Sequence, residues 1–318
     1  MFMKSFDLKK LSRPVVLSLV ISSAALSAVW EEPAFATEAA VSAATVNYER
    51  DWIVTPKAAY ELIQQGALVL DARDVDLKKK QGVLANAVPV TWQDLSEPDL
   101  PTKGRLIGDA NELTKKLQAL GISKNQPIVV VADPINGWGE DGRVAWSLRS
   151  VGHTQVVIAD GGLAAIQKVG ALAIQPAKIP GDFVVAGASK YEIKKEEIKD
   201  HLPKKDLALL DVREPREYAG KTPYGESRGG HVPGAQGLWY KDLIGKDGKL
   251  LPRAQIEKVL AAKGVTKDKE VVPYCTGGIR SGWTTLVLTD LGYKARNYTG
   301  SMWEWSAQPA AEYPLQKN

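Results

Sequence analysis

The chain has 318 residues, of which 44% are hydrophobic and 25% are charged. This length and composition are typical of a globular protein with two domains, and they exclude an intrinsically disordered chain. The formal net charge of +4 is small and no long basic run is present, so nucleic acid is not an expected partner.

Residues 1–36 are predicted to be an export signal. A basic segment precedes the 15-residue apolar stretch 15–29, and small residues at Ala34 and Ala36 suit a signal peptidase. The stretch is short for a membrane span, which needs about 20 residues. We expect a periplasmic or secreted protein with no stable membrane insertion after cleavage, although an uncleaved anchor is the alternative.

Residues 37–50 are expected to form a flexible leader, and a run of alternating helices and strands follows it. Apolar residues at helical spacing predict helices, and short continuous apolar runs predict buried strands. The predicted order is helix 55–66, strand 67–73, helix 109–121, strand 127–133, helix 142–152 and strand 155–159.

The second half of the chain repeats this order. It contains helix 191–202, strand 207–213, helix 253–264, strand 270–274, helix 281–292 and strand 294–298. Asp71 and Arg73 precede Asp211 and Arg213 by 140 residues, so the two halves share a nearly fixed offset. Such an offset indicates a tandem duplication.

These patterns predict an α/β protein with two domains, each a parallel sheet with helices on both faces. We place the first domain at 51–175 and the second at 190–318. The segment 176–189 contains Pro, Gly and Ser and is the expected linker.

Cys275 is the only cysteine of the chain and directly follows the strand predicted at 270–274. Two glycines follow it, so the loop before the next helix is able to turn its amides toward an anion. Helix N-termini and nearby cations lower a thiol pKa, and Arg280 supplies a cation. We therefore predict a thiolate that is open to solvent.

The loop "CTGGIRS" occurs together with the segments "LLDVREPREY", "GGHVPGA" and "GSMWEWSA". Through these segments the chain resembles the two-domain rhodanese sulfurtransferases. The resemblance implies that Cys275 takes a sulfane sulfur from a small donor, becomes a persulfide, and passes the sulfur to cyanide or a thiol. A protein thiol is a further possible acceptor, and no metal or organic cofactor is implied. The offset places the counterpart of Cys275 near Ile135, so the first domain is expected to be catalytically silent.

The other candidate residues have roles implied by position or by the resemblance. The loop amides of Thr276, Gly277, Gly278, Ile279 and Arg280 are expected to hold the sulfur. Ser281 is expected either to cap the following helix, which is slightly favoured, or to donate to the sulfur. The supporting candidates are Asp211 and Arg213 as a bracing ion pair, Arg216 and Arg228 as anion clamps, and Trp303 as a cleft wall.

The residues after Cys275 match neither thiosulfate nor 3-mercaptopyruvate enzymes. Glu217 stands where the latter carry an arginine that grips the substrate, so the sequence favours thiosulfate or a polysulfide as donor. A phosphatase is disfavoured because four residues, not five, separate Cys275 from Arg280. An exported redox-sensing or sulfide-binding module without turnover remains the alternative.

Overall fold

A computed structural model describes residues 46–187 and 189–317, and all of these residues belong to one compact unit. The predicted export signal and residues 37–45 of the predicted leader lie outside the described residues. None of the helices in the described part of the chain is long and apolar enough to cross a membrane.

The first domain is built on a five-stranded sheet in which every pair of neighbouring strands is parallel. The strand order is β1-β5-β4-β2-β3. The strands are β1 (Ile53–Val54), β2 (Leu68–Asp71), β3 (Val88–Pro89), β4 (Ile128–Val131) and β5 (Val156–Ala159). Each residue of β2, β4 and β5 is buried, as expected for strands covered on both faces.

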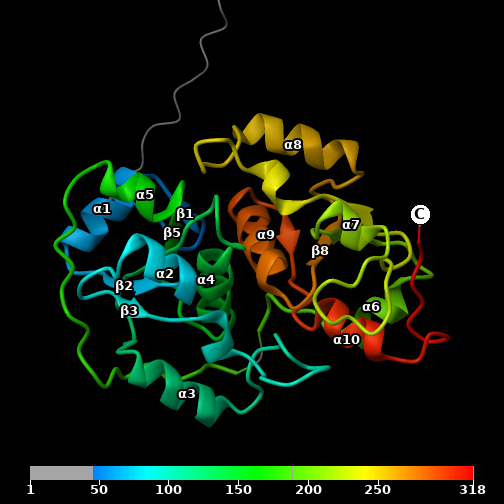
Figure 1. Cartoon of the computed structure of the whole chain (residues 1–318), viewed down its shortest axis with the longest axis horizontal. Coiled ribbons are helices and arrows are strands. Elements are labelled where there is room, and N and C mark those ends of the chain that lie inside the picture. The colour runs from blue at the N-terminus through cyan, green and yellow to red at the C-terminus, as the bar shows by residue number, and fades with distance from the viewer. Residues whose placement is uncertain (1–45, 188, 318) are drawn as a thin grey trace, which may run out of the picture. The chain divides into compact units, whose positions relative to one another are not determined.

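Helices cover both faces of this sheet (Figure 1). One face packs on α1 and α5, and the other packs on α3 and α4. The helices are α1 (Pro56–Gln64), α2 (Val75–Gln81), the 3₁₀ turn η2 (Trp92–Leu95), α3 (Ala110–Ala119), α4 (Glu140–Ser150) and α5 (Gly162–Gln167). Helix α1 begins where the Thr55 side chain accepts from the Ala58 amide and Pro56 supplies a helical φ angle.

The second domain has a four-stranded parallel sheet with the order β7-β6-β8-β9. Its strands are β6 (Leu207–Asp211), β7 (Gln236–Gly237), β8 (Glu270–Tyr274) and β9 (Lys294–Ala295). The counterpart of the β1–β5 pair is reduced to one parallel bridge, between Glu192 and Asn297. This bridge lies 139 residues after the Ile53–Ile158 pair of the first sheet, which supports the duplication.

The helices of the second domain also lie on both faces of its sheet. Helices α8 and α9 pack on one face, and α6 and α10 pack on the other. The helices are α6 (Lys195–His201), α7 (Pro215–Tyr218), the 3₁₀ turn η3 (Tyr240–Leu243), α8 (Arg253–Ala262), α9 (Ile279–Asp290) and α10 (Ser301–Ala307). The predicted fold class is therefore confirmed.

One hydrophobic core runs through both domains. It includes Leu148 of α4 and Leu286 of α9, and it reaches Val130 in the first sheet and Val271 in the second. Helices α4 and α9 lie side by side between the two sheets (Figure 1). The first turns of both helices consequently face the same region of the molecule, where the cysteine lies.

Two segments are held more firmly than the sequence predicts. The end of the expected leader, 46–50, forms a turn in which the Asn47 carbonyl accepts from the Asp51 amide at 2.7 Å. The Tyr48 carbonyl accepts from Arg149 Nη1 at 2.7 Å, so this part of the leader is packed on the first domain. Within the linker, Phe183 is buried in the core and its amide bonds to the Ile122 carbonyl.

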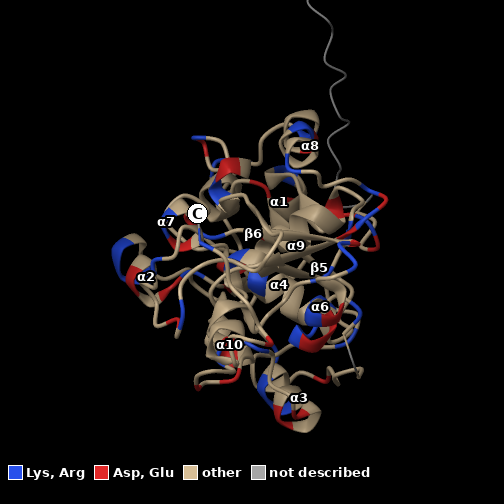
Figure 2. Cartoon of the chain, turned by 90° about the vertical axis from the view of Figure 1, so that its right-hand side faces the viewer, with Lys and Arg blue, Asp and Glu red and all other residues tan. Residues whose placement is uncertain are grey.

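Charges of both signs are mixed on the surface. Figure 2 shows Lys and Arg interspersed with Asp and Glu along α2, α3 and α6. This distribution agrees with the small net charge.

Candidate active site

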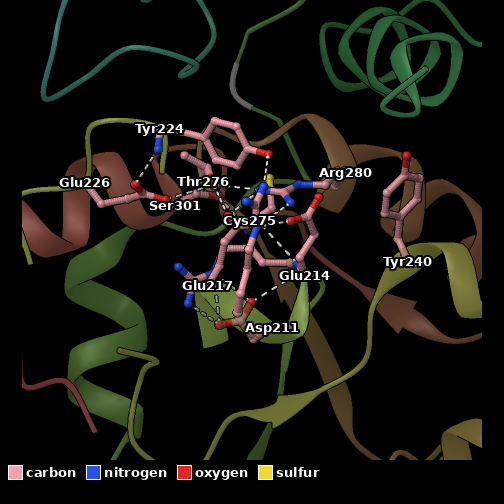
Figure 3. Close-up of polar contacts among 12 residues, drawn as sticks. Asp211, Glu214, Glu217, Tyr224, Glu226, Tyr240, Cys275, Thr276, Arg280 and Ser301 are labelled. Atoms are coloured by element: carbon pink, nitrogen blue, oxygen red, sulfur yellow. Dashed lines mark hydrogen bonds and ion pairs between the residues drawn. The ribbon is translucent and has the colours of Figure 1, made fainter. Parts of the chain in front are cut away.

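Cys275 directly follows β8, at the carboxyl end of the sheet. The Gly278 amide donates to its Sγ at 3.1 Å, and the Ser281 hydroxyl lies 3.5 Å from the same atom. The Cys275 amide itself donates to Ser301 Oγ at 3.0 Å, which fixes the backbone at the start of the loop (Figure 3). The sulfur is therefore contacted by the Gly278 amide and the Ser281 hydroxyl, while Ser301 holds the Cys275 main chain.

The surroundings of Cys275 lower the pKa of its thiol. Burial opposes ionisation, but the Arg280 charge, the Ser281 hydroxyl and nearby amides outweigh it and lower the pKa. The predicted exposure of the sulfur is wrong, because Cys275 is only 1% exposed. The Gly278 amide bonds the buried sulfur, and Cys275 lines a pocket together with the loop that follows it.

Each of the two loop glycines has its own steric reason. Gly278 has a φ of 84°, in the left-handed region that favours glycine. A Cβ on Gly277 would collide with the Trp303 ring, which packs directly over the loop. The pair of glycines therefore allows both the turn of the chain and its closure by an aromatic side chain.

Helix α9 starts earlier than predicted, with Gly278 as its N-cap residue and Ile279 as its first residue. Ile279 and Arg280 thus belong to the first helical turn, and the loop is reduced to Thr276–Gly278. The predicted capping role of Ser281 is wrong for the same reason, since it lies inside the helix. Its hydroxyl faces the sulfur, in line with the alternative role.

Arg280 forms a buried ion pair with Glu217, a residue without an assigned role in the sequence prediction. Its Nη1 and Nη2 lie 2.6 and 2.9 Å from the two carboxylate oxygens, and Nη2 also donates to Thr276 Oγ1. The Thr276 hydroxyl in turn donates to Glu217 at 2.8 Å (Figure 3). The cation that lowers the pKa of the Cys275 thiol is therefore fixed in place by a bidentate carboxylate.

Arg143, on α4 of the first domain, is a second positioning group that the sequence analysis missed. It is fully buried and its Nη1 donates to the Gly278 carbonyl at 2.9 Å. This bond orients the peptide whose neighbouring amide faces the sulfur. Burial lowers the pKa of Arg143 to about 10, and the Cys275 charge partly opposes that shift.

The predicted ion pair between Asp211 and Arg213 is present and buried, with an N–O distance of 2.6 Å. Arg213 Nη2 also donates to the Gly230 carbonyl at 2.7 Å. The first domain repeats the arrangement with Asp71 and Arg73 at 2.7 Å. Because the pair occurs in both domains, it is a brace of the fold at the end of an inner strand, β2 or β6.

Neither of the two arginines predicted to bind a substrate anion has that role in the structure. Arg228 donates to the carbonyls of residues 305, 306, 308 and 313, so its guanidinium fixes the end of α10 and is not a clamp. Arg216 is exposed and pairs with Glu214 at 2.5 Å. Neither side chain lines the pocket that contains Cys275.

The pocket above Cys275 has a volume of about 320 Å³. Its second-domain wall contains Trp303, as predicted, whose Nε1 donates to the Tyr224 carbonyl at 2.8 Å. The first domain supplies the rest of the wall, with Asp74, Trp92, Gln93, Trp138 and Glu140. Among the described residues that line the pocket, Arg280 alone is basic.

The counterpart of Cys275 in the first domain is Ala132, not a residue near Ile135. The Ala132 carbonyl accepts from Leu163 N just as the Cys275 carbonyl accepts from Met302 N. Six residues separate Ala132 from the N-cap glycine of α4, whereas two separate Cys275 from that of α9. The constant offset fails here because the first-domain loop is four residues longer.

In the part of the chain that the structure describes, no group of three or more His, Cys, Asp and Glu residues is arranged to hold a metal ion. The site is assembled from the cysteine, main-chain amides, serine hydroxyls and arginine–carboxylate pairs. These groups stabilise an anionic sulfur and leave an aromatic pocket above it.

Known proteins resemble the chain in sequence and fold. The family profile described as rhodanese-like domain matches residues 55–169 and 194–308. A thiosulfate sulfurtransferase of Pseudomonas aeruginosa is 35% identical over 212 residues, covering 66% of this chain and 77% of the relative. The sulfur carrier protein TtuD of Thermus thermophilus is 28% identical over 253 residues, covering 74% and 87%.

Among solved structures, the 3-mercaptopyruvate sulfurtransferase of Leishmania major aligns with a TM-score of 0.66 and 20% identity. The alignment covers 80% of this chain and 74% of that one, and at this identity it shows the shared fold. The two profile matches coincide with the two sheets described above. The chain therefore belongs to the rhodanese-like family and is a sulfurtransferase with two such domains in tandem.

Proposed function

We propose that Cys275 carries the transferred sulfur as a persulfide. Its thiolate attacks the sulfane sulfur of the donor, a new S–S bond forms, and the donor's S–S bond breaks. With thiosulfate, sulfite leaves with the electron pair and Cys275–S–S⁻ remains. The observation that supports this role is that Cys275 lines the pocket with its Sγ 3.1 Å from the Gly278 amide.

The second half of the cycle returns the enzyme to its thiolate. A nucleophile attacks the outer sulfur and the Cys275 sulfur leaves with the electron pair. With cyanide the products are thiocyanate and the free thiolate, and a small thiol or a protein thiol is the other acceptor. The lowered pKa of Cys275 favours this step, because a stabilised thiolate is a better leaving group.

We further propose thiosulfate or a polysulfide as donor in preference to 3-mercaptopyruvate. A substrate carboxylate needs a free guanidinium, and the arginine of the pocket, Arg280, already pairs bidentately with Glu217. Arg216 pairs with Glu214, and Arg228 is bonded to carbonyls. A donor panel with cyanide as the common acceptor tests this preference.

The first domain is proposed to be catalytically silent, because Ala132 occupies the place of the nucleophile.

Export to the periplasm or the outside of the cell is likewise proposed from the sequence of residues 1–36. If the signal is cleaved after Ala36, the mature protein begins at Thr37, and N-terminal sequencing of the exported protein checks this.

Intact-mass spectrometry tests the persulfide directly. After incubation with thiosulfate or polysulfide, the protein should gain one sulfur atom, and cyanide should remove it. The Cys275→Ser variant should gain none while keeping its fold. A protein that shows only oxygen adducts or mixed disulfides would instead support the redox-sensing alternative, and transfer by the serine variant would reject Cys275 as nucleophile.

A further inference from the structure

The pocket contains a buried carboxyl group that the steps above do not use. Glu140 is the first residue of α4, it is 4% exposed, and it lines the same pocket as Cys275. It belongs to the first domain, which has no nucleophile of its own. A carboxyl group buried beside a reactive sulfur is a candidate for proton transfer.

The longer loop of the first domain holds this carboxyl group at the pocket. Glu140 Oε2 accepts from the Trp138 amide at 2.8 Å, and the Trp138 ring packs edge-on against Tyr224 at 5.8 Å. The Tyr240 hydroxyl of the second domain donates to the Gly137 carbonyl at 2.9 Å. Both domains therefore fix the loop and, through it, the carboxyl group.

Tyr240 lies within electrostatic range of both the carboxyl group and the sulfur. Burial raises the pKa of the Tyr240 hydroxyl, the charges of Glu140, Asp141 and Cys275 raise it further, and the Arg280 charge lowers it. Figure 3 shows Tyr240 on one side of the Cys275 site. Glu140 and Cys275 thus line one pocket from the two domains, and Tyr240 is within range of both charges.

Burial raises the pKa of Glu140 to about 7, against the lowering effect of its own amide and that of Trp138. The charge of Asp141 on the same helix raises it further, as does that of Asp74. The other ionisable groups facing this region are Tyr240, Lys241, Asp133 and Arg280. A base with a pKa near the working pH is well suited to proton transfer.

Building on the proposed persulfide route, we propose that Glu140 is the general base that activates a thiol acceptor. The carboxylate takes the proton of R–SH while the sulfur attacks the outer atom of Cys275–S–S⁻. The bond between the two persulfide sulfurs breaks, which gives R–S–S⁻, the Cys275 thiolate and a protonated Glu140. The total charge of the reacting groups is −2 both before and after this step. Glu140 then releases the proton to solvent.

The chemistry explains why a thiol needs this base and sulfite does not. A free thiol has a pKa of about 8.5, so at pH 7 nearly all of it is protonated and a poor nucleophile. Hydrogen cyanide is also protonated at pH 7, so it is not a suitable comparison. Sulfite is in large part an unprotonated dianion at this pH; it takes the outer sulfur to form thiosulfate and gives up no proton in the transfer step. Removing the base should therefore slow one branch of the reaction and leave the other unchanged.

The test uses the full-length protein as the Glu140→Gln variant, because glutamine keeps a carbonyl oxygen for the Trp138 amide. The protein is loaded with sulfur and discharged in single turnovers with dithiothreitol or with sulfite at pH 7. We expect the dithiothreitol rate to fall about 100-fold, within the usual 10²–10⁴-fold range of acid–base catalysis, and the sulfite rate to stay unchanged.

The pH profile provides a second measurement that includes the wild-type protein. With Glu140 as base, the wild-type dithiothreitol rate should level off above about pH 7. The variant should keep accelerating toward the pKa of the thiol itself. A wild-type rate that simply follows thiol ionisation would overturn the proposal even if the variant failed to fold.

Asp141→Asn is the matched control, since Asp141 is a buried neighbour that does not line the pocket. It should keep the base and leave the sulfite rate unchanged, and it should only lower the pH at which the dithiothreitol rate levels off, because the Asp141 charge raises the Glu140 pKa. An unchanged dithiothreitol rate in Glu140→Gln, or an equal loss with both acceptors, would reject the base role. Failure to load sulfur at all in the wild type would instead refute the persulfide route, so the two failures are distinguishable.

Discussion

The Glu217→Gln substitution should destabilise the protein while it makes the thiol more acidic. Glu217 is fully buried, and it receives both Nη atoms of Arg280 as well as the Thr276 hydroxyl. The change removes one negative charge and leaves the Arg280 cation buried with a neutral partner. The free energy of unfolding and the pKa of the Cys275 thiol are thus both expected to fall, a combination that a general loss of structure would not produce.

The stability loss follows from the burial of the pair. Removing one partner of a buried ion pair costs about 3–5 kcal/mol, and the glutamine oxygen keeps part of the bonding, which favours the lower end. A loss of about 3 kcal/mol corresponds to a Tm decrease of about 6–12 °C in a protein of this size. Differential scanning calorimetry checks this value.

The same substitution should make the Cys275 thiol a stronger acid. Burial raises the pKa of Cys275 and the Arg280 charge lowers it. Without the carboxylate of Glu217, the Arg280 charge is less compensated, so the pKa of the thiol should fall further. The rate of alkylation by iodoacetamide, measured against pH, should reach its midpoint at a lower pH in the variant than in the wild type.

Glu214→Gln is the control, because its partner Arg216 is exposed and surface pairs contribute at most about 1 kcal/mol. Its Tm should therefore stay within a few degrees of the wild type. The reasoning would be refuted if Glu217→Gln raised the alkylation midpoint, or if both variants had the same Tm.

Two further predictions concern residues away from the reaction. Burial raises the pKa of Asp290 to about 6, so its ionisation destabilises the fold as pH rises from about 4 to 6. Asp290→Asn keeps the one oxygen that accepts from Trp52 N and Ile53 N, and should stabilise the protein at pH 7 by about 1–3 kcal/mol in urea unfolding. Arg228→Ala should lower the free energy of unfolding by about 2 kcal/mol yet leave the kcat of the folded protein near the wild-type value. A selective loss of thiosulfate binding would instead show that Arg228 binds the substrate anion.

The sequence was sufficient to predict the repeated architecture. Buried strands such as β4 and β8 are continuous apolar runs, and the helices show apolar residues at helical spacing, so local pattern and final structure agree. The single cysteine after a strand, followed by two glycines and an arginine, also indicated the reactive loop. These features are local, and a few neighbouring residues determine each of them.

Other features depend on which residues meet in three dimensions. Glu217 lies 63 residues before its partner Arg280, and Glu140 and Trp138 reach the pocket from the other domain. No periodicity or spacing announces such contacts. The packing of α4 against α9 brings the first turns of both helices to one place, and so it decides which side chains surround the sulfur.

The sequence by itself therefore determined the two domains, the order of their main strands and helices, and the place of Cys275 directly after a strand, where we propose the nucleophile. The tertiary structure decided that the sulfur is buried, that Arg228 fixes a helix end, and that the first domain forms one wall of the pocket. The physical reason is that strand and helix formation depends on short-range patterns, whereas charge pairing and burial depend on distances between segments far apart in the chain.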